Sequence, residues 1–130
     1  MTTGLLRPEP ANPADPDGAS RAVLEHSTGR WGALTLAALL DGPLRFAQLA
    51  RAVRGISDRM LVQTLQRLET HGLVSRRPHP TTPLRVDYAL TDLGRPIALR
   101  IRDLIDTIHD QLPGIIAHHH SAPPAPGESS

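Results

Sequence analysis

Two amphipathic helical patterns, separated only by a Gly-Ile-Ser turn, lie in the middle of the chain, and their closeness restricts the fold more than any other feature. The first pattern runs from Phe46 to Gly55 and the second from Ser57 to His71. Ser57 is a favourable N-cap, and Asp58 suits the positive end of a helix dipole. The pair predicts a helix-turn-helix unit, since each pattern repeats its apolar residues every three or four positions: Phe46, Leu49, Ala50 and Val53, then Leu61, Leu65 and Leu68.

Two further helices are expected before this unit and a β-hairpin after it. The helices are Ser20–Ser27, with Ser20 as the N-cap, and Trp31–Pro43, which is stopped by its final Gly-Pro. The sequence Pro43–Phe46 suits a short strand. Between Leu73 and Leu90 the apolar spacing changes to every second residue, which predicts two antiparallel strands joined by a proline-rich tip.

A long terminal helix with a continuous apolar stripe is expected from Thr91 to Leu112. Pro96 has no amide hydrogen to donate to the carbonyl of Asp92, so a break or kink is expected at Gly94–Pro96. The helix is long for one small core, and a second subunit is the simplest cover for its stripe. The alternative is a terminal helix that packs wholly on its own domain.

This order of elements predicts a mainly α (α+β) fold, namely a winged helix-turn-helix with a two-stranded β-wing and a long C-terminal dimerisation helix. The chain of 130 residues suits one domain. Proline-rich, polar ends predict disordered tails at residues 1–18 and 114–130, which leaves residues 19–113 as the folded domain.

Positive charge is concentrated in one third of the chain. The segment Arg45–Arg85 has eight arginines and only two acidic residues, although the net charge of the whole chain is only +1. Such a block favours a polyanionic partner, and the alternative is a solvated basic face. Arginine pairs with guanine and glutamine with adenine in the major groove, so double-stranded DNA is the expected partner. Predicted DNA-binding residues are Arg45, Ser57, Arg59, Met60, Gln63, Thr64, Arg67, Arg76, Arg77 and Arg85.

The chain closely resembles the HxlR family of bacterial winged-helix regulators. The resemblance is carried by "GRWGALTLAALLDGPLRFAQLARAVRGIS", "RMLVQTLQRLETHGLVSRR" and "PLRVDYALTDLGR". It implies a transcriptional regulator, expected to be a repressor, that binds an inverted-repeat operator as a homodimer joined through its first and last helices. The implied interface residues are Val23, Leu24, Ile97, Ile101, Leu104, Ile105, Ile108 and Leu112.

The chain departs from the family pattern at three places. Family members commonly begin the domain with a Cys-Pro pair that some use to sense oxidants, but Gly18 and Ala19 stand there and the chain has no cysteine. Val62 and Thr64 replace the polar and basic residues that are frequent on the recognition helix, so the operator sequence cannot be carried over. Pro96 is also unusual at its position.

Other classes of function find little support in the sequence. There is no GxGxxG, P-loop or nucleophile-elbow motif, so an enzyme is not expected, and neither is a cofactor. The histidine run His118–His120 is not expected to hold a metal. No signal peptide or membrane-spanning run is recognised, which favours a cytoplasmic protein without a membrane partner.

By analogy of fold, Trp31 and Tyr88 could line a pocket for a small-molecule effector. The alternative function is a winged helix that binds proteins and not DNA.

Overall fold

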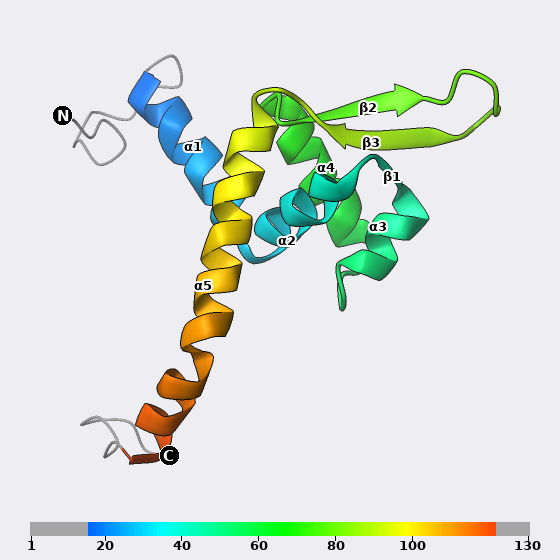
Figure 1. Ribbon diagram of the computed structural model, residues 1–130. Coiled ribbons are helices and arrows are strands. Elements are labelled where there is room, and N and C mark those ends of the chain that lie inside the picture. Colours follow the sequence, from blue (N-terminus) through cyan, green and yellow to red (C-terminus); the bar gives the residue numbers. More distant parts are fainter. Residues whose placement is uncertain (1–15, 122–130) are drawn as a thin grey trace.

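The structure is a computed structural model that describes residues 16–121. Helices, strands and one 3-10 turn follow in the order α1 (Pro16–Thr28), α2 (Arg30–Ala38), η2 (Leu39–Asp41), β1 (Leu44–Arg45), α3 (Phe46–Ala52), α4 (Asp58–Thr70), β2 (Val74–Pro78), β3 (Val86–Leu90) and α5 (Gly94–Ser121). In Figure 1 the helices α2, α3 and α4 form the body, and the β2–β3 hairpin and α5 extend from it in different directions. This is the mainly helical winged helix-turn-helix fold that the sequence predicts.

A leucine-rich core joins the helices of the body. Most of the leucines come from the apolar faces of α2, α3 and α4, which is why the spacing of three and four residues identified these helices, and the others come from η2 and from the residue before β2. Burial of one such side chain stabilises the fold by roughly 1.5–3 kcal/mol. The fully or almost fully buried leucines are Leu36, Leu39, Leu49, Leu61, Leu65, Leu68 and Leu73.

The sheet has three strands and not the two that were predicted for the wing. Its order is β1-β3-β2, and all neighbours are antiparallel. Leu44 of β1 pairs with Tyr88 of β3, and Val74 of β2 pairs with Leu90. The sequence indicated the short β1 strand but could not identify its partner, because that partner lies more than 40 residues further along the chain.

Helix α1 is longer than predicted and is joined almost directly to α2. It begins at Pro16, so Ser20 lies inside the helix and is not the N-cap. A single residue, Gly29, separates the two helices. Its amide donates to the carbonyl of Glu25, and its carbonyl accepts from the amide of Ala33, so helical hydrogen bonding continues across the junction. Gly32 permits the close packing that follows, since a Cβ atom there would lie 1.9 Å from the carbonyl oxygen of His26.

The predicted break in the terminal helix is absent because α5 begins later, at Gly94. The Gly94 amide donates to Thr91 Oγ1 at 3.0 Å, and this contact caps the start of the helix. Pro96 consequently falls in the first turn, where a missing amide hydrogen costs little.

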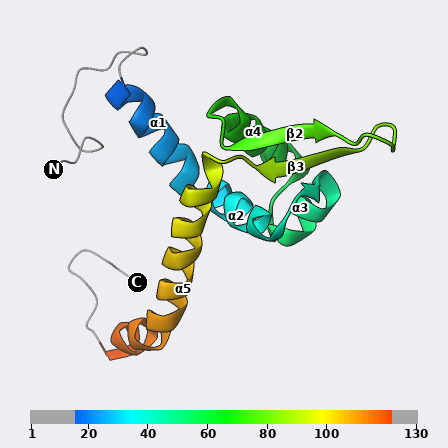
Figure 2. The same cartoon turned by 45° about the horizontal axis from the view of Figure 1, so that its top comes forward.

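The predicted end of the terminal helix at Leu112 is also wrong. Helix α5 continues through Pro113 to Ser121 and so covers residues 114–121 of the expected tail; residues 1–15 and 122–130 of the two expected tails lie outside the described residues. Proline at position 113 cannot donate to the carbonyl of His109, which favours a bend. Figure 2 shows the last turns of α5 running in a different direction from the rest of the helix.

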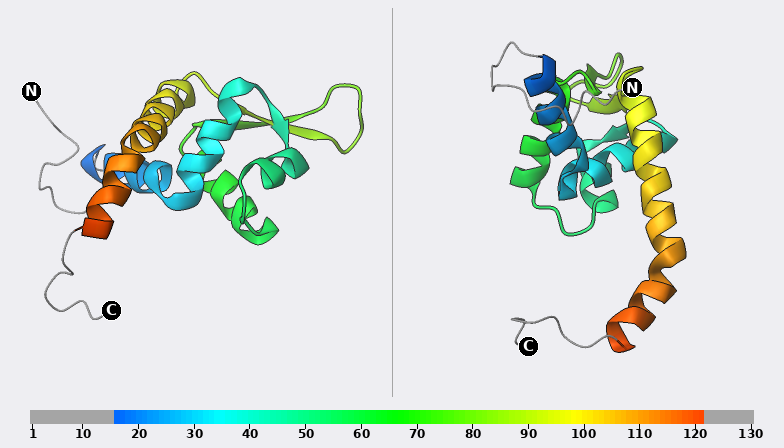
Figure 3. Two further views of the ribbon diagram at one scale, coloured as in Figure 1. Left: turned by 60° about the horizontal axis from the view of Figure 1, so that its bottom comes forward. Right: turned by 90° about the vertical axis from the view of Figure 1, so that its left-hand side faces the viewer.

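The wing and the terminal helices lie on opposite sides of the body (Figure 3). Arg102 fixes α5 to the body, because its guanidinium donates to the carbonyl of Ala37 at 3.0 Å and lies 3.6 Å from the carboxylate of Asp41. From Asp106 onward every described residue of α5 is exposed. The molecule therefore presents two separate surfaces, one around α4 and the wing and the other along α1 and α5.

Candidate nucleic-acid interface

Helix α4 has a well-defined start and one exposed face. Ser57 acts as the predicted N-cap, since its Oγ accepts a hydrogen bond from the Met60 amide at 3.1 Å. Gly55 makes the tight turn before it with a φ of +87°, a conformation that glycine adopts without strain. Four side chains of α4 are buried against the core. The opposite face presents Arg59, Val62, Gln66 and Thr70 as exposed residues and Gln63 as a half-buried one.

Thr64 does not lie on this exposed face. Its side chain is only 5% exposed and contributes to a small cavity of about 120 Å³ between α1 and α4. Met60 and Arg67 border the same cavity, so they flank the face on the side of α1. The prediction for Thr64 therefore has no support in the structure, because a buried hydroxyl cannot reach a DNA groove. Arg67 is exposed and Met60 half-buried, so both remain candidates at the edge of the face.

Gln66 belongs to the exposed face but was not among the predicted DNA-binding residues. It follows Gln63 by three positions and Arg59 by seven, and such residues lie on one face of a helix. That spacing was available in the sequence and could have identified Gln66 in place of Thr64.

The arginines of the wing divide between its two faces. Arg45, Arg76 and Arg85 surround a concave region of about 520 Å³, together with Phe46 and Tyr88. Arg77 lies on the other face of β2, where its Nε donates to Ser75 Oγ at 3.1 Å. The alternation along the strand thus separates Arg76 from Arg77, as expected for neighbouring residues of a strand.

Most of the positive charge in the segment Arg45–Arg85 is exposed and unneutralised. Of its eight arginines, seven are exposed and Arg85 is half-buried. Within residues 16–121, Arg85 alone among these eight has a carboxylate within ion-pair distance, at 3.2 Å from Asp87. The basic surface defined by these eight arginines therefore remains available to an anionic partner.

A pair of histidines connects α1 to the end of α4. His26 Nδ1 and His71 Nε2 are 2.7 Å apart, so one ring donates a hydrogen bond to the other. Burial, and secondarily the charge of His26, lower the pKa of His71 below its ordinary value of 6.5. His71 is the C-cap residue of α4, so this contact links the position of α1 to that of the helix with the exposed polar face.

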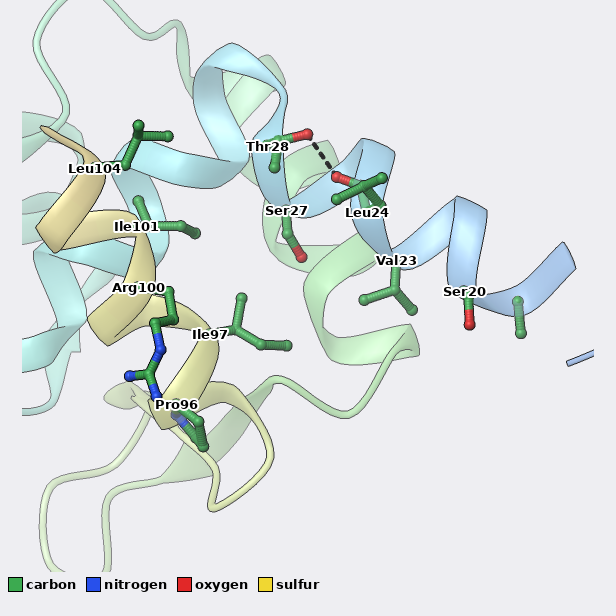
Figure 4. A pocket seen from close by; sticks show the side chains of 11 residues that line it. Ser20, Val23, Leu24, Ser27, Thr28, Pro96, Ile97, Arg100, Ile101 and Leu104 are labelled. Atoms are coloured by element: carbon green, nitrogen blue, oxygen red, sulfur yellow. Dashed lines mark hydrogen bonds between the residues drawn. The ribbon is translucent and has the colours of Figure 1, made fainter. Parts of the chain in front are cut away.

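A broad apolar groove runs between α1 and α5. It has a volume of about 670 Å³, and Figure 4 shows Val23 and Leu24 of α1 facing Ile97 and Ile101 of α5 across it. Ser27 also lines the groove, and its buried hydroxyl has no hydrogen-bond partner among the described residues. Five of the eight predicted interface residues line this groove: Val23, Leu24, Ile97, Ile101 and Leu104.

The other predicted interface residues differ in exposure. Ile105 packs partly against the core, whereas Ile108 and Leu112 are exposed on the projecting part of α5. Ile101 is only 6% exposed and forms the floor of the groove more than its rim. Ile115 and Ile116 continue the exposed apolar stripe, and they were missed because the helix was expected to end at Leu112.

The structure does not bring the predicted pocket residues together. Trp31 borders the small cavity between α1 and α4, and Arg30 stacks on its ring at 4.3 Å from the centroid. Tyr88 borders the concave region of the wing instead. The two side chains border separate cavities, so the expectation that both line one effector pocket finds no support in this structure.

Neither a metal cluster nor a membrane-spanning helix is found in the described part of the chain. No group of three or more histidine, cysteine, aspartate or glutamate side chains among residues 16–121 could hold a metal ion. None of the described helices is long and apolar enough to cross a membrane.

Known proteins share both the sequence and the fold. Residues 27–115 match the HxlR-like helix-turn-helix family. The chain is 44% identical to the HTH-type transcriptional regulator YtfH of Escherichia coli over 98 residues, which cover 75% of this chain and 78% of that protein. The structure of ytfH from Salmonella typhimurium has a TM-score of 0.72 and 44% identity, over 78% of this chain and 90% of that one. The reduced form of YodB from Bacillus subtilis has a TM-score of 0.61 and 30% identity, over 75% and 92%.

These similarities and the exposed face of α4 define a helix-turn-helix transcriptional regulator, a class of DNA-binding proteins and not of enzymes. The chain belongs to the HxlR-like helix-turn-helix family. The YodB structure is that of the reduced form of the regulator, which raises the question of thiol chemistry in this chain. This chain contains no cysteine, so it cannot use a thiol for redox control.

Proposed function

We propose that the protein is a homodimeric, sequence-specific repressor that binds an inverted-repeat operator in double-stranded DNA. The observation that carries the proposal is the exposed polar face of α4, which lies within a basic surface whose arginines, Arg85 excepted, have no carboxylate nearby among the described residues. A helix of this kind fits the major groove, and the arginines around it neutralise phosphates.

The side chains of α4 would read bases, and those of the wing would hold the backbone. Arg59 in the first turn is suited to a guanine, and Gln63 and Gln66 to adenines. Ser57 is exposed at the start of α4, and helix starts commonly contact phosphate. Met60 and Arg67 would contact the edge of the site. Arg45, Arg76, Arg77 and Arg85 would bind phosphates or the adjacent minor groove, where the negative potential is high.

The dimer would form through the groove and the apolar stripe of α5. Ile108, Leu112, Ile115 and Ile116 lie on a helix that projects beyond the body, and solvent exposure of such a stripe is unfavourable. The hydroxyl of Ser27 also lacks a partner on the groove wall, and a second subunit could supply one. Two copies joined at this end would present two copies of α4 to symmetric half-sites about 34 Å apart or a multiple of that distance.

Selection of bound duplexes from a random pool tests DNA binding, symmetry and half-site spacing together. The proposal expects an enriched inverted repeat. A salt titration with the selected duplex should show log K falling by about 0.9 per phosphate neutralised. Failure to bind any duplex at low salt would contradict the proposal and favour a winged helix that binds proteins.

A further inference from the structure

Leu84 at the tip of the wing has two unfavourable properties at once. Its relative exposure is 102%, so its apolar side chain makes no contact that removes it from water. Its φ angle is +66°, and it is the one non-glycine residue with a positive φ in the described part of the chain. Both properties are disfavoured for leucine, because the left-handed conformation crowds its Cβ and because apolar surface is poorly solvated. A glycine or asparagine at this position would avoid both costs.

The tip of the wing holds Leu84 in place through hydrogen bonds. The amide of His79 donates to the carbonyl of Arg85 at 2.7 Å, and the Arg85 amide donates to the carbonyl of Thr82 at 3.2 Å. The ring of His79 accepts from the amides of Thr81 and Thr82 at 3.3 and 3.0 Å. Pro80 and Pro83 further restrict the backbone of the tip. Leu84 is therefore presented outward by an ordered turn.

The surroundings of Leu84 favour a polyanion over an apolar protein partner. Leu84 borders the concave region of the wing together with Arg45, Arg76 and Arg85. Arginines that border the same concave region as an apolar tip can bind the phosphates beside a minor groove while the tip faces the groove. The space between the two phosphate backbones has apolar sugar walls and stacked bases, where apolar side chains of architectural proteins are known to insert.

We propose that Leu84 is an apolar wedge that enters the minor groove beside each half-site and partly opens one base step. The inference rests on the proposed DNA binding and adds to it a specific contact and a deformation of the duplex. Opening a step is easiest at pyrimidine–purine steps, which stack weakly. Leu84 would thus select sequence through the flexibility of the DNA, at positions where no hydrogen bond reads a base.

Parallel selections from one random duplex pool test the wedge. The proteins are the full-length wild type, Leu84→Asn and Leu84→Met. Asparagine tolerates a positive φ and removes the apolar group, whereas methionine keeps an apolar side chain with the same backbone cost. Thermal melting of each variant checks that the fold is retained.

The wild type and Leu84→Met should enrich pyrimidine–purine steps on the wing side of each half-site and should bend the selected duplex in a resonance-energy-transfer assay. Leu84→Asn should enrich the same major-groove motif without these steps, bind the wild-type duplex roughly tenfold more weakly and bend it less. Equal step preference and equal bend in Leu84→Asn would overturn the wedge while leaving DNA binding intact. Absence of any enriched duplex for all three proteins would overturn the proposed function itself.

Discussion

Single residues on α4 have different roles according to the side of the helix on which they lie. Burial of Leu61, Leu65 and Leu68 directs Arg59 toward solvent, and the cap at Ser57 fixes the first turn that presents it. A change at Arg59 should therefore affect binding without affecting the core.

Arg59→Ala should weaken binding to the selected operator by about 1–3 kcal/mol and relax the sequence preference at one position in each half-site, because it removes a base contact. Fluorescence anisotropy with the cognate duplex measures the loss. Arg95→Ala is the matched control, since it removes an arginine that is also exposed but lies outside the basic segment, and it should bind as the wild type does. Equal affinity of Arg59→Ala and the control would remove Arg59 from the contact set.

His71 should make the stability of the protein depend on pH. Its pKa is lowered in the folded protein, so the unfolded chain binds the proton more readily. Stability is then fully present above about pH 6.5, the ordinary pKa, and is lost as the pH falls through the lowered folded value. The Tm of the wild type should fall more between pH 7.5 and pH 5.5 than the Tm of His71→Gln. Parallel curves for the two proteins would show that another group controls the acid response.

The residues of α4 also show what a sequence can and cannot predict about a site. The helical period predicted that Arg59 and Gln63 lie off the buried face of α4, and the capping preference of serine predicted Ser57 as the N-cap, because both signals depend only on the helix itself. The same period also puts Thr64 on the buried face, three residues after Leu61 and four before Leu68, but it could not show that α1 and α2 cover the flank where Met60 and Arg67 lie. Packing between segments far apart in sequence decides which flank of a helix is exposed.

Among the structural elements, α5 depends most on how it begins. Gly94 is buried against Leu73, the residue before β2, and a Cβ atom at Gly94 would lie 2.0 Å from the carbonyl oxygen of Leu73. Thr91 accepts the Gly94 amide and donates from its hydroxyl to the carbonyl of Gly72. The start of α5 is thus fixed against the end of α4 with no space for a larger residue.

Gly94→Ala should lower the free energy of unfolding by about 2–3 kcal/mol, since the added methyl group must displace backbone atoms. Urea denaturation measures the change. Gly114→Ala provides the control within the same helix, because its Cβ meets nothing within 4 Å and alanine favours a helix by roughly 0.5–1 kcal/mol. Similar stabilities for the two variants would contradict the close approach of Gly94 to the backbone of Leu73.

Prolines made the limits of α5 difficult to predict. Pro96 suggested a break, but the cap at Thr91 shifts the helix start so that the proline lies in the first turn. Pro113 and Gly114 suggested an end, but the apolar residues Ile115 and Ile116 extend the stripe and the helix continues. A proline indicates a lost hydrogen bond, and the neighbouring contacts determine whether the helix tolerates that loss.

For the whole molecule, the division into two surfaces suggests that dimer formation and DNA binding use different parts of the chain. The apolar stripe of α5 beyond Ile105 contacts no other described residue that would bury it. The sequence predicted the stripe, which the structure confirms as far as Leu112, whereas the dimer stays a prediction. The sequence did not predict the groove between α1 and α5, because the groove depends on the angle between two helices that are far apart in sequence.

Ile108→Asp should convert a dimer to monomers and weaken operator binding, because a carboxylate would be buried in an apolar interface. Ile108 is 47% exposed in the single chain, so the substitution should leave the core intact. Sedimentation velocity measures the assembly. Thr107→Asp adds the same charge to the adjacent exposed position, away from the stripe, and should remain dimeric. A dimeric Ile108→Asp protein would exclude the distal part of α5 from the interface.

The single residue between α1 and α2 has a consequence for the arrangement of promoters. With Gly29 as the whole connection, and with His26 touching the end of α4, the proposed dimer has no flexible arm by which either copy of α4 could search for its site. One extra base pair would rotate the far half of an operator by about a tenth of a turn around the duplex axis. A regulator built in this way should accept one spacer length, and its targets in a genome would be recognised by that length as much as by their bases.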